Sequence, residues 1–211
     1  SIRDFFLNAL PVRTVEKTRF RFDAASGAVA WEKGAREPYS LTVDGLVRDA
    51  KTFSYPELTG FARVEQASDF HCVEGWSVRD LAWGGFRFGE IVARVNPLPG
   101  ATHVLFHSLG MTGSSPRGQG HYIESLPLAE LLDPAREILL ALFMNGKPLP
   151  EDHGAPLRLI TPFDLAYKSI KFIRRMEFLG EARPGWWTLA NPVYPVEARV
   201  PKSRLRRAPG R

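Results

Sequence analysis

The chain has 211 residues, 44% hydrophobic and 24% charged, which is typical of a soluble globular protein with one large domain or two small ones. No apolar run approaches the ~20 residues that a membrane-spanning helix needs, and the longest covers only 138–144. The single cysteine, Cys72, excludes an intramolecular disulfide and a zinc site built on paired cysteines.

The net charge of +5 is concentrated at one end of the chain. Segment 201–211 carries five basic residues and no acidic one, and without it the basic and acidic residues are equal at 23 each. The body is therefore neutral, which argues against a nucleic-acid-binding protein. We expect 191–211 to be a solvated, mobile basic tail that contacts anionic surfaces only weakly.

The first half of the chain is predicted to be mostly strands. Alternating patterns predict a hairpin at 19–31 and a strand within 39–47. Ser54 and Glu57 have capping-box spacing around an early proline, so a short helix is expected to begin there. Further patterns predict other elements: strands at 62–67 and 69–75, a helix at 87–95, and a buried strand at 102–110 that runs into a glycine-rich loop.

The second half continues with short elements. A helical turn is predicted at 127–133, and a new turn is expected to begin at Asp133-Pro134. Strands are predicted at 138–150 and 155–160, with Asn145-Gly146 as a hairpin-type turn. Segment 168–178 could be strand or helix, and the adjacent Trp186 and Trp187 are expected on opposite faces of a strand. Seventeen prolines disfavour long helices.

Several catalytic motifs are missing. Loop 110–120 matches neither a serine-hydrolase elbow nor a phosphate-binding P-loop, so a surface loop is the simplest interpretation. His103 and His107 are four residues apart, but they lie in a predicted strand and lack the intervening glutamate of a zinc-protease motif.

Two groups of residues could carry chemistry. Cys72 follows an apolar strand and precedes a Gly-containing turn, so it is either a packed core residue or a soft metal ligand. Segment 152–171 interleaves cations with turn residues, which suits a phosphate or pyrophosphate but also fits solvated surface charge. Its members of interest are His153, Arg158, Lys168, Ser169 and Lys171.

An ordered set of motifs resembles a known family. The segments are FHCVEGWSV, AWGGFRF, HYIESLPLAELLD, LFMNGKPLPEDHGAPLRLITP and YKSIKFI. Together they are similar to the molybdopterin-binding oxidoreductases of the sulfite oxidase superfamily, in the bacterial branch that includes the methionine-sulfoxide reductase catalytic subunit. The resemblance implies an α+β fold with mixed β-sheets and short peripheral helices. It also implies one domain, with an N-terminal extension at 1–39, a core at 40–190 and a tail at 191–211.

The resemblance implies a cofactor and a set of site residues. The cofactor is molybdenum held by one pterin dithiolene, with the Cys72 thiolate as the metal ligand. His107 corresponds to a polar residue on the substrate side, for which a catalytic role is expected. The expected cofactor contacts are His71, Cys72, His107, Ser108, His153, Arg158, Ala166, Tyr167, Lys168, Ser169 and Lys171.

The implied activity is two-electron chemistry at molybdenum, with oxygen-atom transfer to or from a small-molecule substrate. The cysteine motif differs from that of animal and plant sulfite oxidases, so the substrate stays open. No haem segment is visible, so a separate electron-transfer protein is expected. A non-catalytic cofactor-binding or redox-partner module is the alternative. Without a visible export signal the cytoplasm is favoured, whereas removal of a signal before Ser1 would indicate the periplasm.

Overall fold

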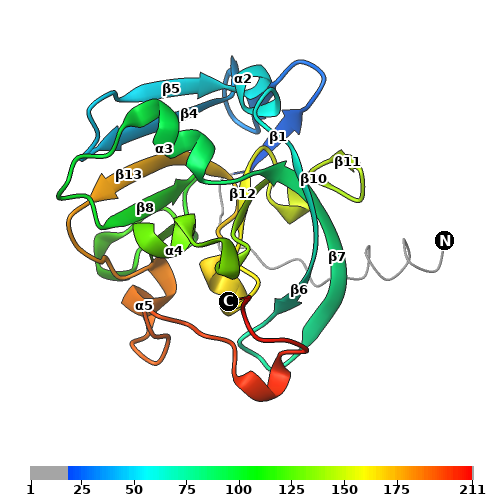
Figure 1. The fold of residues 1–211 in the computed structure, drawn as a ribbon. Helices are drawn as coiled ribbons and strands as arrows, with labels where there is room; N and C mark the ends of the chain where they lie inside the picture. Colours follow the sequence, from blue (N-terminus) through cyan, green and yellow to red (C-terminus); the bar gives the residue numbers. More distant parts are fainter. Residues whose placement is uncertain (1–18, 211) are drawn as a thin grey trace.

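The structure is a computed structural model that describes residues 19–210, and Figure 1 shows its layout. Its sheets and short helices confirm the α+β class. A small antiparallel sheet near the N-terminus contains β1 (Phe20–Asp23), β2 (Ala28–Trp31) and β3 (Arg36–Pro38). The predicted hairpin at 19–31 is confirmed by the β1–β2 pairing. The division into 1–39, 40–190 and 191–211 stays a prediction, and residues 1–18 lie outside the described part.

One of the two larger sheets positions Cys72. Its strands pair in the order β11-β10-β7-β6, with β12 also pairing with β10, and every pair is antiparallel. The strands are β6 (Val64–His71), β7 (Ser77–Phe86), β10 (Leu139–Met144), β11 (Lys147–Pro148) and β12 (Arg158–Ile160). The last β6–β7 pair is His71 with Ser77, so Cys72 is the first residue of the connecting turn.

The other sheet has the order β5-β4-β13-β8-β9. Its strands are β4 (Ser40–Gly45), β5 (Lys51–Ser54), β8 (His103–Ser108), β9 (Ile123–Pro127) and β13 (Ile173–Leu179). Only the β4–β13 pair among them is parallel. In Figure 1 this sheet lies beside the long β6–β7 ribbon, with α3 in front of it.

The helices are short, as the many prolines suggest. The α-helices are α2 (Tyr55–Thr59), α3 (Gly89–Val95), α4 (Leu128–Leu132) and α5 (Trp186–Ala190). Single 3-10 turns lie at Pro116–Gly118, Pro134–Arg136, Glu151–His153, Ala166–Lys168 and Lys202–Arg204. Within residues 19–210 no helix combines the length and the apolarity needed to cross a membrane.

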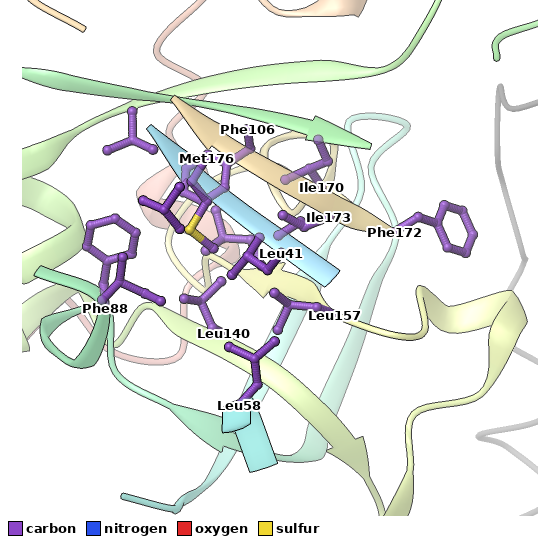
Figure 2. Packing of buried hydrophobic residues seen from close by; sticks show 14 of the residues in the cluster. Leu41, Leu58, Phe88, Phe106, Leu140, Leu157, Ile170, Phe172, Ile173 and Met176 are labelled. Atoms are coloured by element: carbon purple, nitrogen blue, oxygen red, sulfur yellow. The ribbon is translucent and has the colours of Figure 1, made fainter. Parts of the chain in front are cut away.

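Alternation along the strands builds the core. On β4, Leu41 and Val43 are fully buried, and on β13 Met176 and Phe178 are fully buried as well. These side chains meet Phe106 of β8 and residues of α3 in one continuous cluster, part of which Figure 2 shows. A smaller cluster between β7, β10 and β12 includes Trp83. The period-2 pattern therefore places the core on one face of β4 and β13, whereas β10 is buried on both faces and contributes to both clusters.

Most local predictions are confirmed. Ser54 and Glu57 form the capping box of α2, and Asn145 and Gly146 both have positive φ, as a type I′ hairpin turn requires. The strands predicted at 62–67 and 69–75 are instead one strand, β6, which ends before Cys72. Segment 168–178, left open between strand and helix, finishes a 3-10 turn and then forms β13.

Other predictions are wrong or incomplete. The tryptophan pair lies in helix α5 rather than in a strand, with Trp186 buried and Trp187 half-buried. Strands β7 and β9 were not predicted, because Gly84 and Gly85 weaken the strand pattern of β7. The tail is not free: Arg204 and Arg206 contact the β6–β7 region.

Gly85 allows β7 and β10 to pair closely, which gives a test of the fold. A Cβ added at Gly85 would overlap the carbonyl of Leu140, so Gly85→Ala should lower the free energy of unfolding by about 1–3 kcal/mol or more. Gly89→Ala is the matched control, because a Cβ there meets nothing within 4 Å and α3 begins at that residue. Urea unfolding of both variants checks this; equal midpoints would contradict the packing.

Candidate cofactor site

Cys72 lies in a tight turn between β6 and β7. Its amide donates to the carbonyl of Trp76 at 2.9 Å, and the amide of Gly75 donates back to the Cys72 carbonyl at 3.2 Å. Gly75 has φ +97°, a conformation that side-chain-bearing residues rarely adopt. Cys72 itself is 8% exposed, whereas the tip residues Val73 and Glu74 are exposed. The turn therefore holds a thiol just beneath the surface.

Arg158 is brought against the strand that carries Cys72. Its guanidinium carbon lies 5.5 Å from the ring centre of Phe70, two residues before Cys72, and 5.2 Å from that of Trp83 on β7. Arg158 begins β12, which pairs with β10, which in turn pairs with β7. The sheet order thus places Arg158 beside the strand that leads to Cys72, although the two residues are 86 positions apart in the sequence.

The charge of Arg158 is buried without an acidic partner. Its side chain donates to the carbonyls of His153 at 2.8 Å and Ser169 at 3.2 Å, while Nε has no partner among the described residues. Arg158 is 3% exposed, and burial lowers the pKa of its guanidinium to about 9. No ion pair joins it to a carboxylate within residues 19–210. A buried cation in this state favours binding of an anion.

The other cations of this segment lie nearby. A Cβ placed on Gly154 would lie 2.9 Å from Cγ of Lys171 and 3.1 Å from Cβ of Arg158, so both side chains lie against Gly154. The Lys171 ammonium donates to the carbonyl of Asp152 at 3.0 Å. Burial, together with the charges of Arg158 and Lys171, lowers the pKa of His153. Arg158 and Lys171 therefore form a positively charged pair, with the imidazole of His153 beside them.

Ser169 supports this pair through its backbone and its hydroxyl. Its carbonyl accepts from Arg158, and its Oγ lies 3.0 Å from the amide and 2.9 Å from the hydroxyl of Thr161. Ala166 opens the preceding 3-10 turn, and Tyr167 donates to the carbonyl of Pro195. Burial raises the pKa of Tyr167. The cofactor contacts expected of these residues stay predictions.

Lys168 points into a different environment. Its ammonium is 2.5 Å from Oε1 of Glu124 and 2.7 Å from the carbonyl of Ser125, and both Lys168 and Glu124 are buried. Burial raises the pKa of Glu124, against the opposing effect of the Lys168 charge. In this structure the ammonium of Lys168 neutralises an internal carboxylate, while its expected cofactor contact stays a prediction.

His107 is part of a directional chain of hydrogen bonds. Its Nε2 lies 3.0 Å from the Glu177 carboxylate, which can only accept, so Nε2 carries the proton of a neutral ring. Nδ1 then accepts from Nε2 of His121 at 2.8 Å, and Nδ1 of His121 accepts from Gln119 at 3.2 Å. These tautomers are inferred from the partners. The chain leads from loop residue Gln119 to Glu177 on β13.

His71 and Ser108 complete the expected set. His71 is buried on β6 and its Nδ1 lies 2.7 Å from Oγ of Ser77 across the turn. Burial, and then the charge of Arg204, lowers the pKa of His71. Ser108 is buried at the end of β8, beside His107. His71 thus adjoins Cys72, while the contacts given above for His107 lead to His121 and Glu177.

Sequence reasoning missed several residues of this region. Phe70 and Trp83 flank Arg158, His121 continues the chain from His107, and Glu124 neutralises Lys168. His121 begins the segment HYIESLPLAELLD, one of the motifs that resemble the family, and this was a signal for it. Its pairing with His107 could not be predicted, because it depends on how β8 and β9 align. Glu124 gave no signal, because a glutamate in an amphipathic stretch is normally exposed.

The site fits a metal that brings most of its own ligands. Within residues 19–210 no three His, Cys, Asp or Glu side chains converge as an all-protein metal site would need. Cys72 offers one soft sulfur, and Arg158 offers a buried positive charge for an anionic group. A molybdenum bound through the sulfurs of a phosphorylated pterin matches both features.

The ion pair of Lys168 gives a stability prediction. Lys168→Met should lower the free energy of unfolding by about 3–5 kcal/mol, because the buried carboxylate of Glu124 loses its partner. Adding Glu124→Leu to the variant should restore most of the loss. Lys171→Met, at a half-buried site, is the control and should change stability little. A Lys168→Met protein with the wild-type urea midpoint and reduced cofactor content would show that Lys168 acts on the cofactor instead.

The paired histidines predict a pH dependence. Burial, and then the charge of a protonated His107, lowers the pKa of His121 to about 4; Arg174 and Arg175 add to this effect, and Glu177 faces His107. The unfolded state then binds more protons between about pH 6.5 and pH 4, so stability should fall as the pH drops through that window. Urea unfolding at several pH values should show a smaller slope in His121→Gln; an unchanged slope would contradict the assignment.

Comparisons with known proteins identify the family. The family model described as the oxidoreductase molybdopterin binding domain matches residues 27–187. The chain is 36% identical over 161 residues to the protein-methionine-sulfoxide reductase catalytic subunit MsrP of Ralstonia nicotianae, covering 74% of this chain and 48% of that protein. It is 34% identical over 149 residues to the uncharacterized oxidoreductase YuiH of Bacillus subtilis, covering 71% of this chain and 69% of that protein.

A solved structure shares the fold. The sulfane dehydrogenase SoxCD of Paracoccus pantotrophus aligns with a TM-score of 0.59 at 22% identity, covering 68% of this chain and 39% of that chain. The chain spans about half of the MsrP relative that it matches. The matched range includes the Cys72 turn, the Arg158 and Lys171 pair and the His107 chain. The sequence resemblance is confirmed: this chain belongs to the molybdopterin-binding oxidoreductase family of the sulfite oxidase type.

Proposed function

We propose that the chain is a molybdenum cofactor-dependent oxidoreductase that transfers an oxygen atom to or from a small-molecule substrate. The observation that carries the proposal is the buried charge of Arg158, which has no carboxylate partner within residues 19–210 and lies against β6, the strand that ends just before Cys72. When bound, the molybdenum centre supplies two-electron redox chemistry with oxygen-atom transfer. The protein supplies the ligand, the orientation and the surroundings.

Each part of the site has a task in this proposal. Cys72 provides the thiolate for the metal, held in position by the Gly75 turn. Arg158, with His153 and Lys171 beside it, binds the phosphate end of the pterin through charge and hydrogen bonds. Further contacts with the pterin are proposed for His71, Ser108, Ala166, Tyr167, Lys168 and Ser169.

The aromatic rings around Arg158 strengthen its attraction for an anion. Trp83 is buried and Phe70 is half-buried, so both exclude water from one side of the guanidinium. An interaction between opposite charges is stronger where water is excluded. The same rings connect Arg158 to β6 and β7, so an anion held by Arg158 lies near the strands that position the thiol.

His107 is proposed to act on the substrate side. The chain of hydrogen bonds leaves its ring neutral, with the proton on Nε2 facing Glu177 and the lone pair of Nδ1 facing His121. A proton taken up at His121 could be relayed through His107 to Glu177 by exchanging donors and acceptors along the chain. This would provide the proton movement that accompanies oxygen-atom transfer to or from a substrate.

The names of the relatives guide the proposal for the substrate and the electron partner. MsrP of Ralstonia nicotianae and MsrP of Gluconobacter oxydans, which is 34% identical over 163 residues, are named as protein-methionine-sulfoxide reductases. We therefore propose a sulfoxide as the first substrate class to assay, with electrons exchanged with a separate redox protein. A reduced dye can replace that protein in the assay.

Arg158→Met tests the proposal, because it keeps a long apolar side chain and removes the charge. The loss of charged hydrogen bonds should weaken cofactor retention by about one to two decades. Molybdenum per chain after dialysis is the measurement, with methionine-sulfoxide-dependent oxidation of a reduced dye as the second. Arg63→Met is the control, because Arg63 stacks on Phe143 and its side chain is 46% exposed.

The outcomes separate the alternatives. Wild-type protein that binds molybdenum but turns over none of the sulfoxides tested with dyes would favour the non-catalytic cofactor-binding module. An Arg158→Met protein that keeps its molybdenum as well as Arg63→Met does would show that Arg158 is not the anion site.

A further inference from the structure

The C-terminal segment reaches the Cys72 turn along a defined path. Leu165 donates to the carbonyl of Ala198 at 2.7 Å, and Val200 donates to the carbonyl of Phe163 at 3.1 Å. Ala198 and Val200 are both buried, and Arg199 pairs with Asp164 at 2.8 Å. These contacts attach the segment to the protein before it enters the 3-10 turn Lys202–Arg204.

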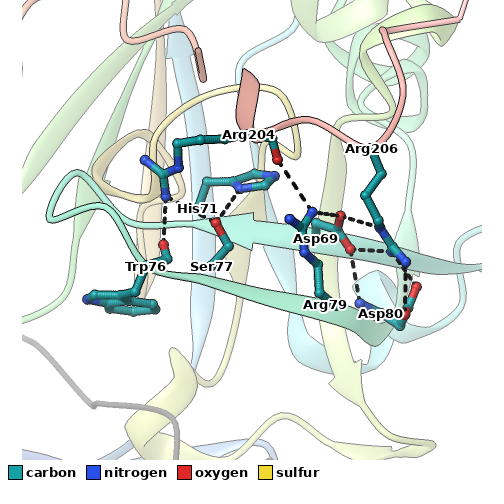
Figure 3. A network of polar contacts seen from close by, with 8 residues as sticks. All are labelled: Asp69, His71, Trp76, Ser77, Arg79, Asp80, Arg204 and Arg206. Atoms are coloured by element: carbon teal, nitrogen blue, oxygen red, sulfur yellow. Dashed lines mark hydrogen bonds and ion pairs between the residues drawn. The ribbon is translucent and has the colours of Figure 1, made fainter. Parts of the chain in front are cut away.

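Arg204 joins both ends of the turn that begins at Cys72. Its guanidinium donates to the carbonyl of Cys72 at 2.9 Å, to the carbonyl of Trp76 at 2.7 Å, and to Oγ of Ser77 at 3.1 Å. Ser77 is also the partner of Nδ1 of His71. Figure 3 shows Arg204 beside His71, Trp76 and Ser77. One side chain therefore holds the two strand ends that the turn connects.

A second arginine attaches the same segment to the irregular part of the β6–β7 ribbon. The pairing shifts register between Ser68 and Phe70, and Asp80 opposite has a φ of 54°. Arg206 bridges Asp69 and Asp80 with contacts of 2.5 Å, and Arg79 also donates to Asp69 at 2.7 Å. Figure 3 shows this network next to Arg204. Arg206 therefore contacts side chains of the strands, and Arg204 contacts the backbone of the turn.

The turn has internal contacts of two kinds, and its side-chain contacts meet at the Glu74 carboxylate, 3.1 Å from Nε1 of Trp76 and 3.9 Å from Sγ of Cys72. Within 72–76 its backbone bonds are those from Cys72 to Trp76 and from Gly75 to Cys72, and residues 73–75 are exposed. The tip of the turn is exposed, and exposed backbone opens more readily than buried backbone, so bonds from outside the turn restrict it further. Arg204 supplies charge-assisted bonds to two of its carbonyls, and such bonds are stronger than neutral ones.

We propose that Arg204 is a positioning residue that fixes the Cys72 turn in the geometry that presents the thiolate to the metal. The proposal rests on the proposed function for the ligand role of Cys72. The three hydrogen bonds from Arg204 to Cys72, Trp76 and Ser77, here called the Arg204 clamp, are present in the protein without the cofactor. Arg204 lies outside the matched range 27–187. It acts through the backbone of Cys72 and Trp76 and not by touching substrate.

The first test uses cofactor-free protein. Arg204→Gln should raise deuterium uptake in peptides covering 70–78 and should raise the rate of Cys72 alkylation by iodoacetamide by about tenfold or more, because charged hydrogen bonds are lost. Cys72 is the single cysteine, so the mass shift reports only on this turn. Arg207→Gln is the matched control, since Arg207 belongs to the same segment but pairs with Glu137.

The second test uses loaded protein and the conservative variant. Arg204→Gln should shift the sulfur-to-molybdenum absorption band and lower molybdenum per chain, whereas Arg207→Gln should match wild type in both. Arg204→Lys keeps the charge but cannot donate to two carbonyls and a hydroxyl in a fixed fork, so it should restore these properties only in part.

The outcomes are distinct. Equal deuterium uptake and alkylation in Arg204→Gln and Arg207→Gln would overturn the clamp. A loosened turn together with an unchanged absorption band would overturn the positioning role, while leaving Cys72 as the metal ligand. A wild-type protein that never takes up molybdenum would instead overturn the proposed function, and the tests on cofactor-free protein would still decide whether the clamp exists.

Discussion

The burial of the Arg158 guanidinium without a carboxylate is the constraint on which the site depends. Folding places this cation between Phe70 and Trp83, where the acceptors of its hydrogen bonds among the described residues are the backbone carbonyls of His153 and Ser169. Such an arrangement is costly unless an anion completes it. Because Phe70 precedes Cys72 by two residues, the proposed anion at Arg158 would lie beside the strand that leads to the thiol. In the proposed site, a single anionic group would both stabilise the buried guanidinium and place the cofactor near Cys72.

The cations of the structure differ in their partners: several pair with carboxylates or hold the C-terminal segment, whereas Arg158 pairs with no carboxylate among the described residues. Lys168 neutralises Glu124 in the interior, and Arg204 and Arg206 hold the C-terminal segment on the β6–β7 ribbon. Arg158 donates to carbonyls, and no carboxylate within residues 19–210 pairs with its positive charge. Burial would raise the pKa of Asp69, yet hydrogen bonds from Arg206 and Arg79 lower it to about 2, so this attachment persists well into the acid range.

Local chemistry could be predicted from the sequence, and long-range pairing could not. The capping box at Ser54 and the turn at Asn145 depend on residues a few positions apart, so their signals were visible. Strand β7 is not predicted because its two glycines have low strand propensity. The close approach of the Leu140 backbone explains Gly85, and the side chains of Glu65 and Arg63 lie beside Gly84. The tail was expected to be mobile because its arginines have no acids nearby in sequence. The main acceptors of Arg204 are carbonyls about 130 positions away. Every residue has a backbone carbonyl, so the residue types do not indicate which one accepts a bond.

X-ray absorption at the molybdenum edge is the most direct test of the central claim, that Cys72 and an Arg158-bound pterin meet at one metal. Wild-type protein should show the sulfur pair of the pterin dithiolene and one further sulfur from Cys72. The Cys72→Ser protein should fold, retain metal through the pterin contacts, and lack that further sulfur. An identical sulfur environment in the two proteins, or no molybdenum in a correctly folded wild type expressed in a host that makes the cofactor, would contradict the account.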